Sequence, residues 1–344
     1  PAILKRMQWG WGLAIFFAIS APWFILVSRA NPEFAHFFFV HEHFERFLTH
    51  EHRRVQPAWF FIPIVLVGFL PWMVALFPAT WNAWREEAGA RFQPLRLALL
   101  WSAFILLFFS ASGSKLPAYV LPLFPSLALV LGRYLATAAP RRLATWAGLV
   151  TLLGIGLLVA SFQLTASARD AWTEALNAKA QPWAVGASAV LIASCVGFAA
   201  LLYSGRRWLS LVGFAFASIL MIECLENAYE ELSPRQSGLG IARVMRPLVT
   251  ADTRLYSVGH YDQTLPFYLG RTMKLVAYVD EFETGQKAEP DCCIARIEDL
   301  GPDWLRPGEA VAIMQPGSYE KLKALGLPMQ VLHDDPRRVL VRKP

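Results

Sequence analysis

The sequence predicts a multispanning α-helical membrane protein of about seven transmembrane helices that carries a small C-terminal α/β domain. The 344 residues are 55% hydrophobic and only 17% charged, with a mean hydropathy of +0.38, which is too apolar for a soluble domain of this length. Long apolar runs recur up to residue 225, and short β-like runs replace them afterwards.

Each apolar run approaches the length of about 20 residues that crosses a bilayer. The predicted spans are residues 7–27, 59–79, 97–111, 116–135, 143–162, 183–203 and 208–225. The third is short and precedes Ser112, Gly113 and Ser114, so we expect it to end below the bilayer surface beside a cavity. We expect a transmembrane domain over residues 1–226, with an outward loop at 28–58, and a separate domain over 227–344.

Basic residues fall on alternate connections between these spans. They are Lys5, Arg6, Arg85, Arg91, Arg96, Arg133, Arg141, Arg142, Arg206 and Arg207. The positive-inside rule assigns such connections to the cytoplasm. The opposite side then holds the loop at 28–58, the turn at 112–115, a loop at 163–182 and everything after Glu226.

The C-terminal region alternates short β-like runs with turn residues. The runs are residues 255–258, 275–279, 292–297, 310–314, 330–333 and 339–341. The segment 318–325 follows Pro316 and Gly317 and precedes Gly326, which predicts a short helix between two strands. These patterns indicate a small α/β domain with its own core. In its segment GHYDQTLPFY, His260 and Asp262 either contact a sugar or a partner or are ordinary surface residues.

Five of the seven histidines lie in the outward loop at 28–58. They are His36, His41, His43, His50 and His52. Side chains that bind metals, transfer protons and bind phosphate are costly near lipid unless they face a polar ligand, which predicts an anionic ligand here. Arg46 and Arg53 are basic on the outward side, against the topology rule, so we expect them to bind that ligand's phosphate.

The segment 37–47 is predicted to form an amphipathic helix on the membrane surface. His41 and Glu45 would share one face and are suited to hold one metal, whereas His41 and His43 would point apart. The alternative is an interfacial helix whose charges are simply solvated.

A second motif, GSKLPAYVLPLFP, joins two predicted spans at the outer surface. Its dense prolines loosen the start of the helix, and Lys115 beside them is suited to bind a phosphate as a point charge. Tyr119 lies about one turn further on, pointing the same way. Alternatively, Lys115 extends to the lipid headgroups and Tyr119 belongs to the aromatic belt.

The outward loop, NPEFAHFFFVHEHFERFLTHEHRRVQPAWFFIPIVLVGFLPW, and the segment GSKLPAYVLPLFPSLALVLG resemble bacterial membrane glycosyltransferases of the protein O-mannosyltransferase superfamily. The similarity is to their second half, and it is strongest to the aminoarabinose transferases of lipid A. It implies a multi-pass protein of the bacterial inner membrane with a periplasmic C-terminal domain. It also implies transfer of a sugar from undecaprenyl phosphate to lipid A or another envelope acceptor. Membrane lipids are expected partners, and nucleic acid is not.

Residue by residue, the resemblance implies that His41 or His43 holds a divalent metal, Zn, Mg or Mn, near the active site. Arg46 and Lys115 would contact the carrier phosphate, and Tyr119 would line the same pocket. The family carries its catalytic carboxylates in a first periplasmic loop, ahead of about six helices. We therefore expect the catalytic residues to lie outside this sequence and the fragment alone to be inactive.

Two alternatives from other classes remain. A membrane metallohydrolase would use the histidine-rich loop to activate water and would require stoichiometric zinc. A non-catalytic transporter or scaffold would place paired charges inside the spans, where this sequence has almost none.

Overall fold

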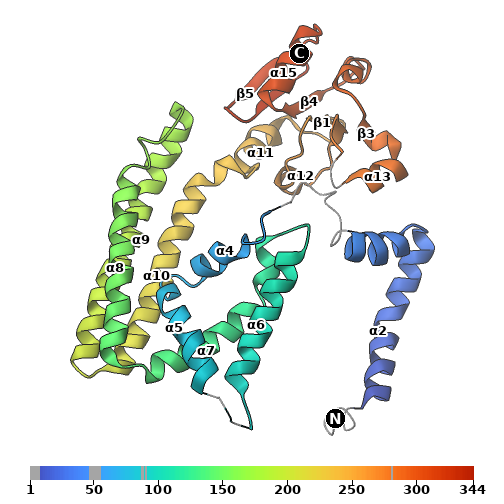
Figure 1. Cartoon of the computed structure of the whole chain (residues 1–344). Helices are drawn as coiled ribbons and strands as arrows, with labels where there is room; N and C mark the ends of the chain where they lie inside the picture. The colour runs from blue at the N-terminus through green and yellow to red at the C-terminus, as the bar shows by residue number, and fades with distance from the viewer. Residues whose placement is uncertain (1–7, 46–55, 87–88, 90, 280–281) are drawn as a thin grey trace. The chain divides into compact units, whose positions relative to one another are not determined.

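The computed structural model describes residues 8–45, 56–86, 89, 91–279 and 282–344, without the side chains of residues 41–45, 284 and 288 (Figure 1). The chain divides into two compact units. The first comprises Pro1–Val150 and Cys195–Phe214, and the second comprises Thr151–Ser194 and Ala215–Pro344. The division cuts through helices α8 (Pro140–Phe162), α9 (Ala171–Tyr203) and α10 (Arg207–Leu232), so each unit is described by itself.

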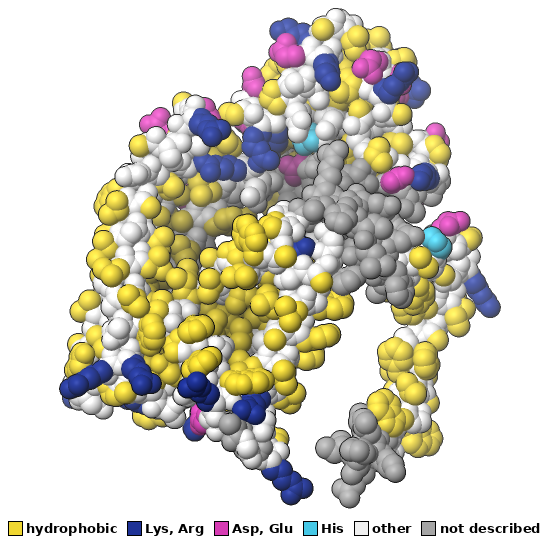
Figure 2. Space-filling view, viewed as in Figure 1, with side chains coloured by type: hydrophobic (Ala, Val, Ile, Leu, Met, Phe, Trp, Pro, Cys, Tyr) yellow, Lys and Arg dark blue, Asp and Glu magenta, His cyan; other side chains and the backbone are white. Residues whose placement is uncertain are grey.

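Five helices in the described part of the chain are long and apolar enough to cross a membrane. They are α2 (Trp9–Ala30), α6 (Pro94–Ala111), α8, α9 and α10. A sixth span is counted if α4 (Phe61–Gly68) and α5 (Met73–Glu86) act together. The chain is therefore a multi-pass membrane protein. Hydrophobic side chains cover the middle of the helices, and Lys and Arg side chains gather at helix ends (Figure 2).

Two of the seven predicted spans differ from regular helices. The segment predicted at 59–79 is bent by 102° between α4 and α5. Pro71 lies in this break and has no N–H to continue the helix. The segment predicted at 116–135 begins with a 3₁₀ turn at Pro117–Val120, and only α7 (Leu123–Thr137) is α-helical, which is short for a span. By length, the described part of the chain therefore has five or six spans, where the sequence predicts about seven.

Helix α9 begins earlier than the sequence analysis expects, because the loop predicted at 163–182 is helical from Ala171. Asp170 caps its start: the backbone N–H and the hydroxyl of Thr173 each donate to a carboxylate oxygen of Asp170 at 2.8 Å. Further along, Asn177 Nδ2 donates to the carbonyl of Leu164 at 2.7 Å, and Gln181 Nε2 donates to that of Ser161 at 3.1 Å. These bonds satisfy carbonyls where α8 ends.

Within the first unit, three basic connections are joined by polar contacts. Arg133 near the end of α7 pairs with Glu86 at the end of α5. Arg207 at the start of α10 donates to the carbonyls of Ala136 and Ala138, between α7 and α8. Arg96 Nε donates to the carbonyl of Trp84 at 2.8 Å. These connections therefore lie at one end of the unit, and the turn after α6 lies at the other end of that helix.

The predicted amphipathic α-helix at 37–47 is instead a π-helix at His36–Glu45. Phe38 of this helix and Phe34 just before it pack back onto α2: the ring centroids of Phe38 and Phe24 lie 5.4 Å apart, and those of Phe34 and Trp23 lie 5.6 Å apart. The side chains of His41 and Glu45 lie outside the described part of the structure, so the face predicted for them stays a prediction.

The C-terminal domain contains a six-stranded sheet in the order β3-β2-β1-β4-β6-β5. The strands are β1 (Arg254–Val258), β2 (Lys274–Val276), β3 (Cys293–Ile294), β4 (Ala310–Met314), β5 (Gln330–Asp334) and β6 (Val339–Arg342). Strands β1 to β4 are parallel, and β6 pairs antiparallel with β4 and β5. Since β2 and β4 flank β1 on opposite sides, the order reverses between β1 and β4, and a crevice is expected there at the carboxyl ends.

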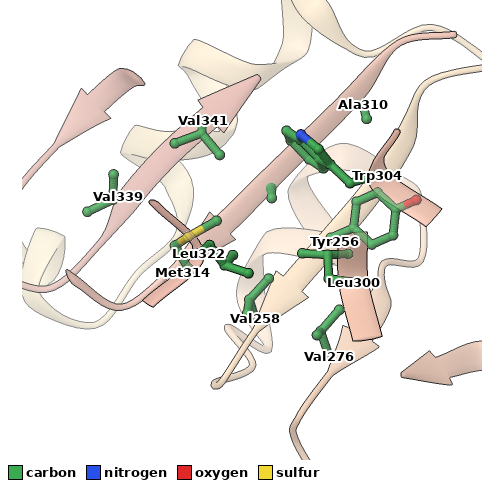
Figure 3. Packing of buried hydrophobic residues seen from close by; sticks show 11 residues of the cluster. Tyr256, Val258, Val276, Leu300, Trp304, Ala310, Met314, Leu322, Val339 and Val341 are labelled. Atoms are coloured by element: carbon green, nitrogen blue, oxygen red, sulfur yellow. The ribbon is translucent and has the colours of Figure 1, made fainter. Parts of the chain in front are cut away.

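Helices cover both faces of this sheet. They are α11 (Leu239–Met245), α12 (Thr264–Leu269), α14 (Leu300–Trp304) and α15 (Pro316–Ala324). A further helix, α13 (Glu283–Ala288), lies in the connection between β2 and β3. On one face Tyr256, Val258 and Met314 pack against Trp304 of α14 and Leu322 of α15 (Figure 3). The other face packs against α11 and α12. Burial on both faces explains why all five residues of the central strand β4 are apolar.

Candidate functional site

Lys115 lies in the turn between α6 and the 3₁₀ turn at Pro117–Val120, and only 6% of it is exposed. Its Nζ donates a hydrogen bond of 2.6 Å to the carbonyl of Ser112, the residue that caps α6. A cation at the carboxyl end of a helix interacts favourably with the helix dipole and with the last carbonyls. The helix end therefore fixes the position of the ammonium group.

Some hydrogen-bonding groups of this turn have no partner among the described residues. An ammonium group has three donors, and the described residues supply Lys115 with one acceptor and no carboxylate. Ser112 Oγ donates to the carbonyl of Ser114 at 3.0 Å, whereas the buried Ser114 Oγ has no hydrogen-bond partner. Burying a charge without a counter-ion costs free energy, so this turn favours an anion.

Tyr119 is half-buried in the same connection. Its ring lies against that of Phe109 near the end of α6, with a centroid distance of 4.9 Å. Trp101 Nε1 of α6 donates to the carbonyl of Pro122 at 3.4 Å, and the hydroxyls of Ser102 and Ser126 lie 2.7 Å apart between α6 and α7. Helix α6 thus supports both Lys115 and Tyr119.

The other residues predicted for this site are outside the described part of the structure. Arg46 and Arg53 lie among residues 46–55, and His41 and His43 lie in the π-helix without described side chains. Elsewhere in the described chain, no group of three or more His, Cys, Asp or Glu side chains is arranged to hold a metal ion. Of the residues predicted to contact the carrier phosphate or line its pocket, the structure therefore describes Lys115 and Tyr119, and both the phosphate site and the metal site stay predictions.

The sequence analysis did not identify a large polar cavity in the second unit, of about 930 Å³. His260 and Asp262, which it singled out, line this cavity together with Arg337 and Arg338 from the turn between β5 and β6. Arg338 is buried, and its Nη1 lies 3.2 Å from Asp262 Oδ2. The signal that could have pointed to this cavity is the strand order, because the loops after β1 and β4 meet where that order reverses.

Comparisons with known proteins show what this chain is similar to. Residues 241–343 match the family model of the aminoarabinose transferase C-terminal domain. A relative from Erwinia tasmaniensis is 33% identical over 202 residues, which cover 55% of this chain and 35% of the relative. A relative from Proteus mirabilis is 41% identical over 119 residues, or 34% and 21% of the two chains. Both are named as undecaprenyl phosphate-alpha-4-amino-4-deoxy-L-arabinose arabinosyl transferases.

The fold is also that of two solved structures. The crystal structure of ArnT from Cupriavidus metallidurans bound to undecaprenyl phosphate matches 99% of this chain with a TM-score of 0.87 and 31% identity. The apo structure of the same protein gives 0.85 and 32%. The chain spans 61% of the solved protein, and its matched segments span about a third or less of these curated relatives. The chain is therefore similar to the aminoarabinose transferases in the sequence of its C-terminal domain, and it shares the fold of the solved ArnT structures.

Proposed function

We propose that this chain supplies the carrier-binding part of a glycosyltransferase, which moves aminoarabinose from undecaprenyl phosphate to lipid A or another envelope acceptor. The names of the relatives and the carrier in the solved structure support this reaction. The single structural observation that carries the proposal is the buried Lys115, which has no carboxylate partner among the described residues. A polyprenyl phosphate is an anion that would complete such a site in a membrane protein.

The chemistry requires such a cation. Displacing the polyprenyl phosphate from the anomeric carbon of the sugar leaves negative charge on the departing phosphate, and a fixed ammonium stabilises that charge. Lys115 is held in place by the end of α6, so little reorganisation is needed when the charge develops. If the acceptor is itself a phosphate, little base catalysis is needed, and the cations do most of the work.

We assign the remaining predicted residues by the same proposal. Arg46 and Arg53 would contact the carrier phosphate, and Tyr119 would line the carrier pocket. His41 or His43 would hold a divalent metal. The catalytic acid or base would lie outside these residues, so that the isolated chain would fold but not transfer sugar.

We also propose the bacterial inner membrane as the location, with the C-terminal domain in the periplasm. The basic connections that meet at one end of the first unit support a cytoplasmic assignment for that end. The turn with Lys115 follows the opposite end of α6 and would face the periplasm.

The test compares two cation substitutions in the full-length transferase that contains this chain. Lys115→Met should lower the transfer of aminoarabinose to lipid A by about tenfold to a hundredfold, since a hydrogen bond to a charged group contributes about 1.5–3 kcal/mol. Arg133→Met is the control, because Arg133 pairs with Glu86 at the opposite end of the unit, and it should have little effect. Equal losses in the two variants would refute the phosphate role. Zinc-dependent hydrolysis without a polyprenyl donor would favour the metallohydrolase.

A further inference from the structure

The cavity in the second unit is formed by four chain segments that are far apart in the sequence. They are the end of α10 with the segment after it, the loop after β1, the residues that begin α15 after β4, and the turn between β5 and β6. Its volume of about 930 Å³ lies at the upper end of the range for small-molecule sites. It lies where strand order reverses between β1 and β4, which is where open α/β sheets bind ligands.

A buried arginine braces the walls of this cavity. Arg338 donates from Nη1 to the carbonyl of Ser237 at 3.0 Å and from Nη2 to that of Pro234 at 2.8 Å. The same side chain pairs with Asp262 at 3.2 Å. Because these contacts join the β5–β6 turn, the segment after α10 and the loop after β1, the cavity is preorganised. Since these contacts already use the guanidinium of Arg338, an anionic ligand must be bound by another cation.

Arg337 supplies that cation. It is exposed, lines the cavity, and has no ion-pair partner among the described residues. Gly317 lines the cavity at the second position of α15, and its backbone N–H has no acceptor in the described structure. The first N–H groups of a helix carry partial positive charge and bind anions. A guanidinium and an N–H of this kind are the groups that bind a phosphate.

The rest of the lining suits a sugar. Tyr229, Tyr261 and Tyr268 offer flat apolar faces with polar edges, and Gln236 and Gln263 offer amides. His260 borders the cavity with a buried Nε2 that has no hydrogen-bond partner in the described structure. Burial is the main cause that lowers the pKa of His260, so the ring is neutral at neutral pH. Its Nδ1 lies 3.4 Å from the carbonyl of Val258, so in the neutral ring Nε2 is the nitrogen left as an acceptor.

We propose that this cavity binds a phosphorylated sugar, with the phosphate against Arg337 and the Gly317 N–H and the sugar against the tyrosines. The ligand is either a free sugar phosphate or the head of a phosphorylated glycolipid. All residues that line the cavity belong to the second unit, whereas Lys115 belongs to the first. Binding of a glycolipid head rests on the proposed function, and binding of a free sugar phosphate does not.

The test measures calorimetric binding to the whole chain in detergent. The probes are glucose 1-phosphate, glucose, inorganic phosphate, and micelles of monophosphoryl lipid A. Glucose 1-phosphate should bind at least about tenfold more tightly than glucose or phosphate if the ligand is free in solution. Binding of the lipid A micelles alone would identify a lipid headgroup. If neither glucose 1-phosphate nor the lipid A micelles bind, the proposal is overturned.

Variants locate the bound probe. Gly317→Asp places a carboxylate at the start of α15, where it suits the helix dipole and meets no atom within 4 Å of its Cβ, so binding should be lost without loss of stability. Gly317→Ala is its matched control and should bind normally. Arg337→Ala should weaken binding about tenfold or more, whereas Lys321→Ala, at the other end of α15, should not. Unchanged binding in both Gly317→Asp and Arg337→Ala, or loss in Lys115→Met instead, would contradict this site.

Discussion

The ammonium of Lys115 donates a hydrogen bond of 2.6 Å to the carbonyl of Ser112, and within the described chain it faces no carboxylate. The bond explains how the side chain is positioned but not why a charge is buried. An apolar side chain of similar length would avoid the free-energy cost of burying this charge. A buried lysine that faces no carboxylate in the described chain is what the proposed carrier-phosphate site requires.

Lys115→Met should leave the stability of the ligand-free protein nearly unchanged, within about 1 kcal/mol. The variant loses one hydrogen bond but also removes the cost of burying a charge. Thermal unfolding in detergent, without added lipid, measures the difference. A large fall in the unfolding temperature would show that Lys115 is a structural residue.

Asp170→Ala should loosen the first turn of α9. The substitution removes the carboxylate that accepts hydrogen bonds from the N–H and hydroxyl of Thr173. Hydrogen exchange of peptides covering this turn should become faster, while exchange in the middle of α9 stays unchanged. Asp170→Asn keeps an acceptor at the cap and should resemble the wild type. Equal effects of the two substitutions would argue against a capping role.

Lys274→Met should destabilise the C-terminal domain in a pH-dependent way. Lys274 Nζ and Arg306 Nη1 each lie 3.0 Å from a carboxylate oxygen of Asp303. Burial raises the pKa of Asp303, but the hydrogen bonds from Lys274 and Tyr256 and the charges of Lys274 and Arg306 together more than offset it, so the net pKa lies below its usual value. A depressed carboxyl pKa adds stability above the unfolded-state pKa of about 3.9, and this stability is lost as the pH falls through the folded-state value.

The stability difference between wild type and Lys274→Met should therefore be largest near neutral pH, at about 1 kcal/mol or more, and should narrow below about pH 4. Hydrogen exchange of peptides from β1 and β4 reports this domain without interference from the membrane helices. The exposed Lys321→Met serves as the control. A difference that is constant from neutral pH to pH 3 would mean that the ion pair does not contribute.

Gly259→Ala should destabilise the loop after β1 for two separable reasons. Gly259 has φ +70°, and a Cβ there would lie 2.7 Å from Ser318 Oγ. The left-handed backbone costs an alanine about 1–2 kcal/mol, and the clash adds to it. Adding Ser318→Ala should restore only the stability that the clash removes. Gly308→Ala, with φ +102° and no atom within 4 Å, shows the cost of the backbone alone and should be milder than Gly259→Ala in unfolding experiments.

Among the C-terminal strands, β4 is predicted best, because all five of its residues are apolar and buried. The predicted run at 310–314 coincides with β4, and the helix predicted at 318–325 overlaps α15 (Pro316–Ala324). The start of α9 was missed, although Asp170 followed by Thr173 and Glu174 is a readable capping signal. The bend between α4 and α5 depends on how Pro71 is accommodated by packing, which a hydropathy pattern does not contain.

The sites could be predicted only in part. The sequence singled out Lys115 and Tyr119 because a lone cation stood beside dense prolines, but the burial of Lys115 is a property of the folded turn. For the cavity, His260 and Asp262 were noted as polar residues. The contacts of Arg338 with Ser237 and Pro234 were not predicted, because these residues precede it by 101 and 104 positions in the chain.

The most direct test of the carrier site compares undecaprenyl phosphate with undecaprenol, which lacks the phosphate, for binding to the wild-type chain and to Lys115→Met in detergent. Native mass spectrometry measures each affinity. We expect the wild type to prefer the phosphate by about tenfold or more and Lys115→Met to lose most of this preference. An equal preference for the phosphate in both proteins would contradict the assignment of Lys115 to the carrier phosphate.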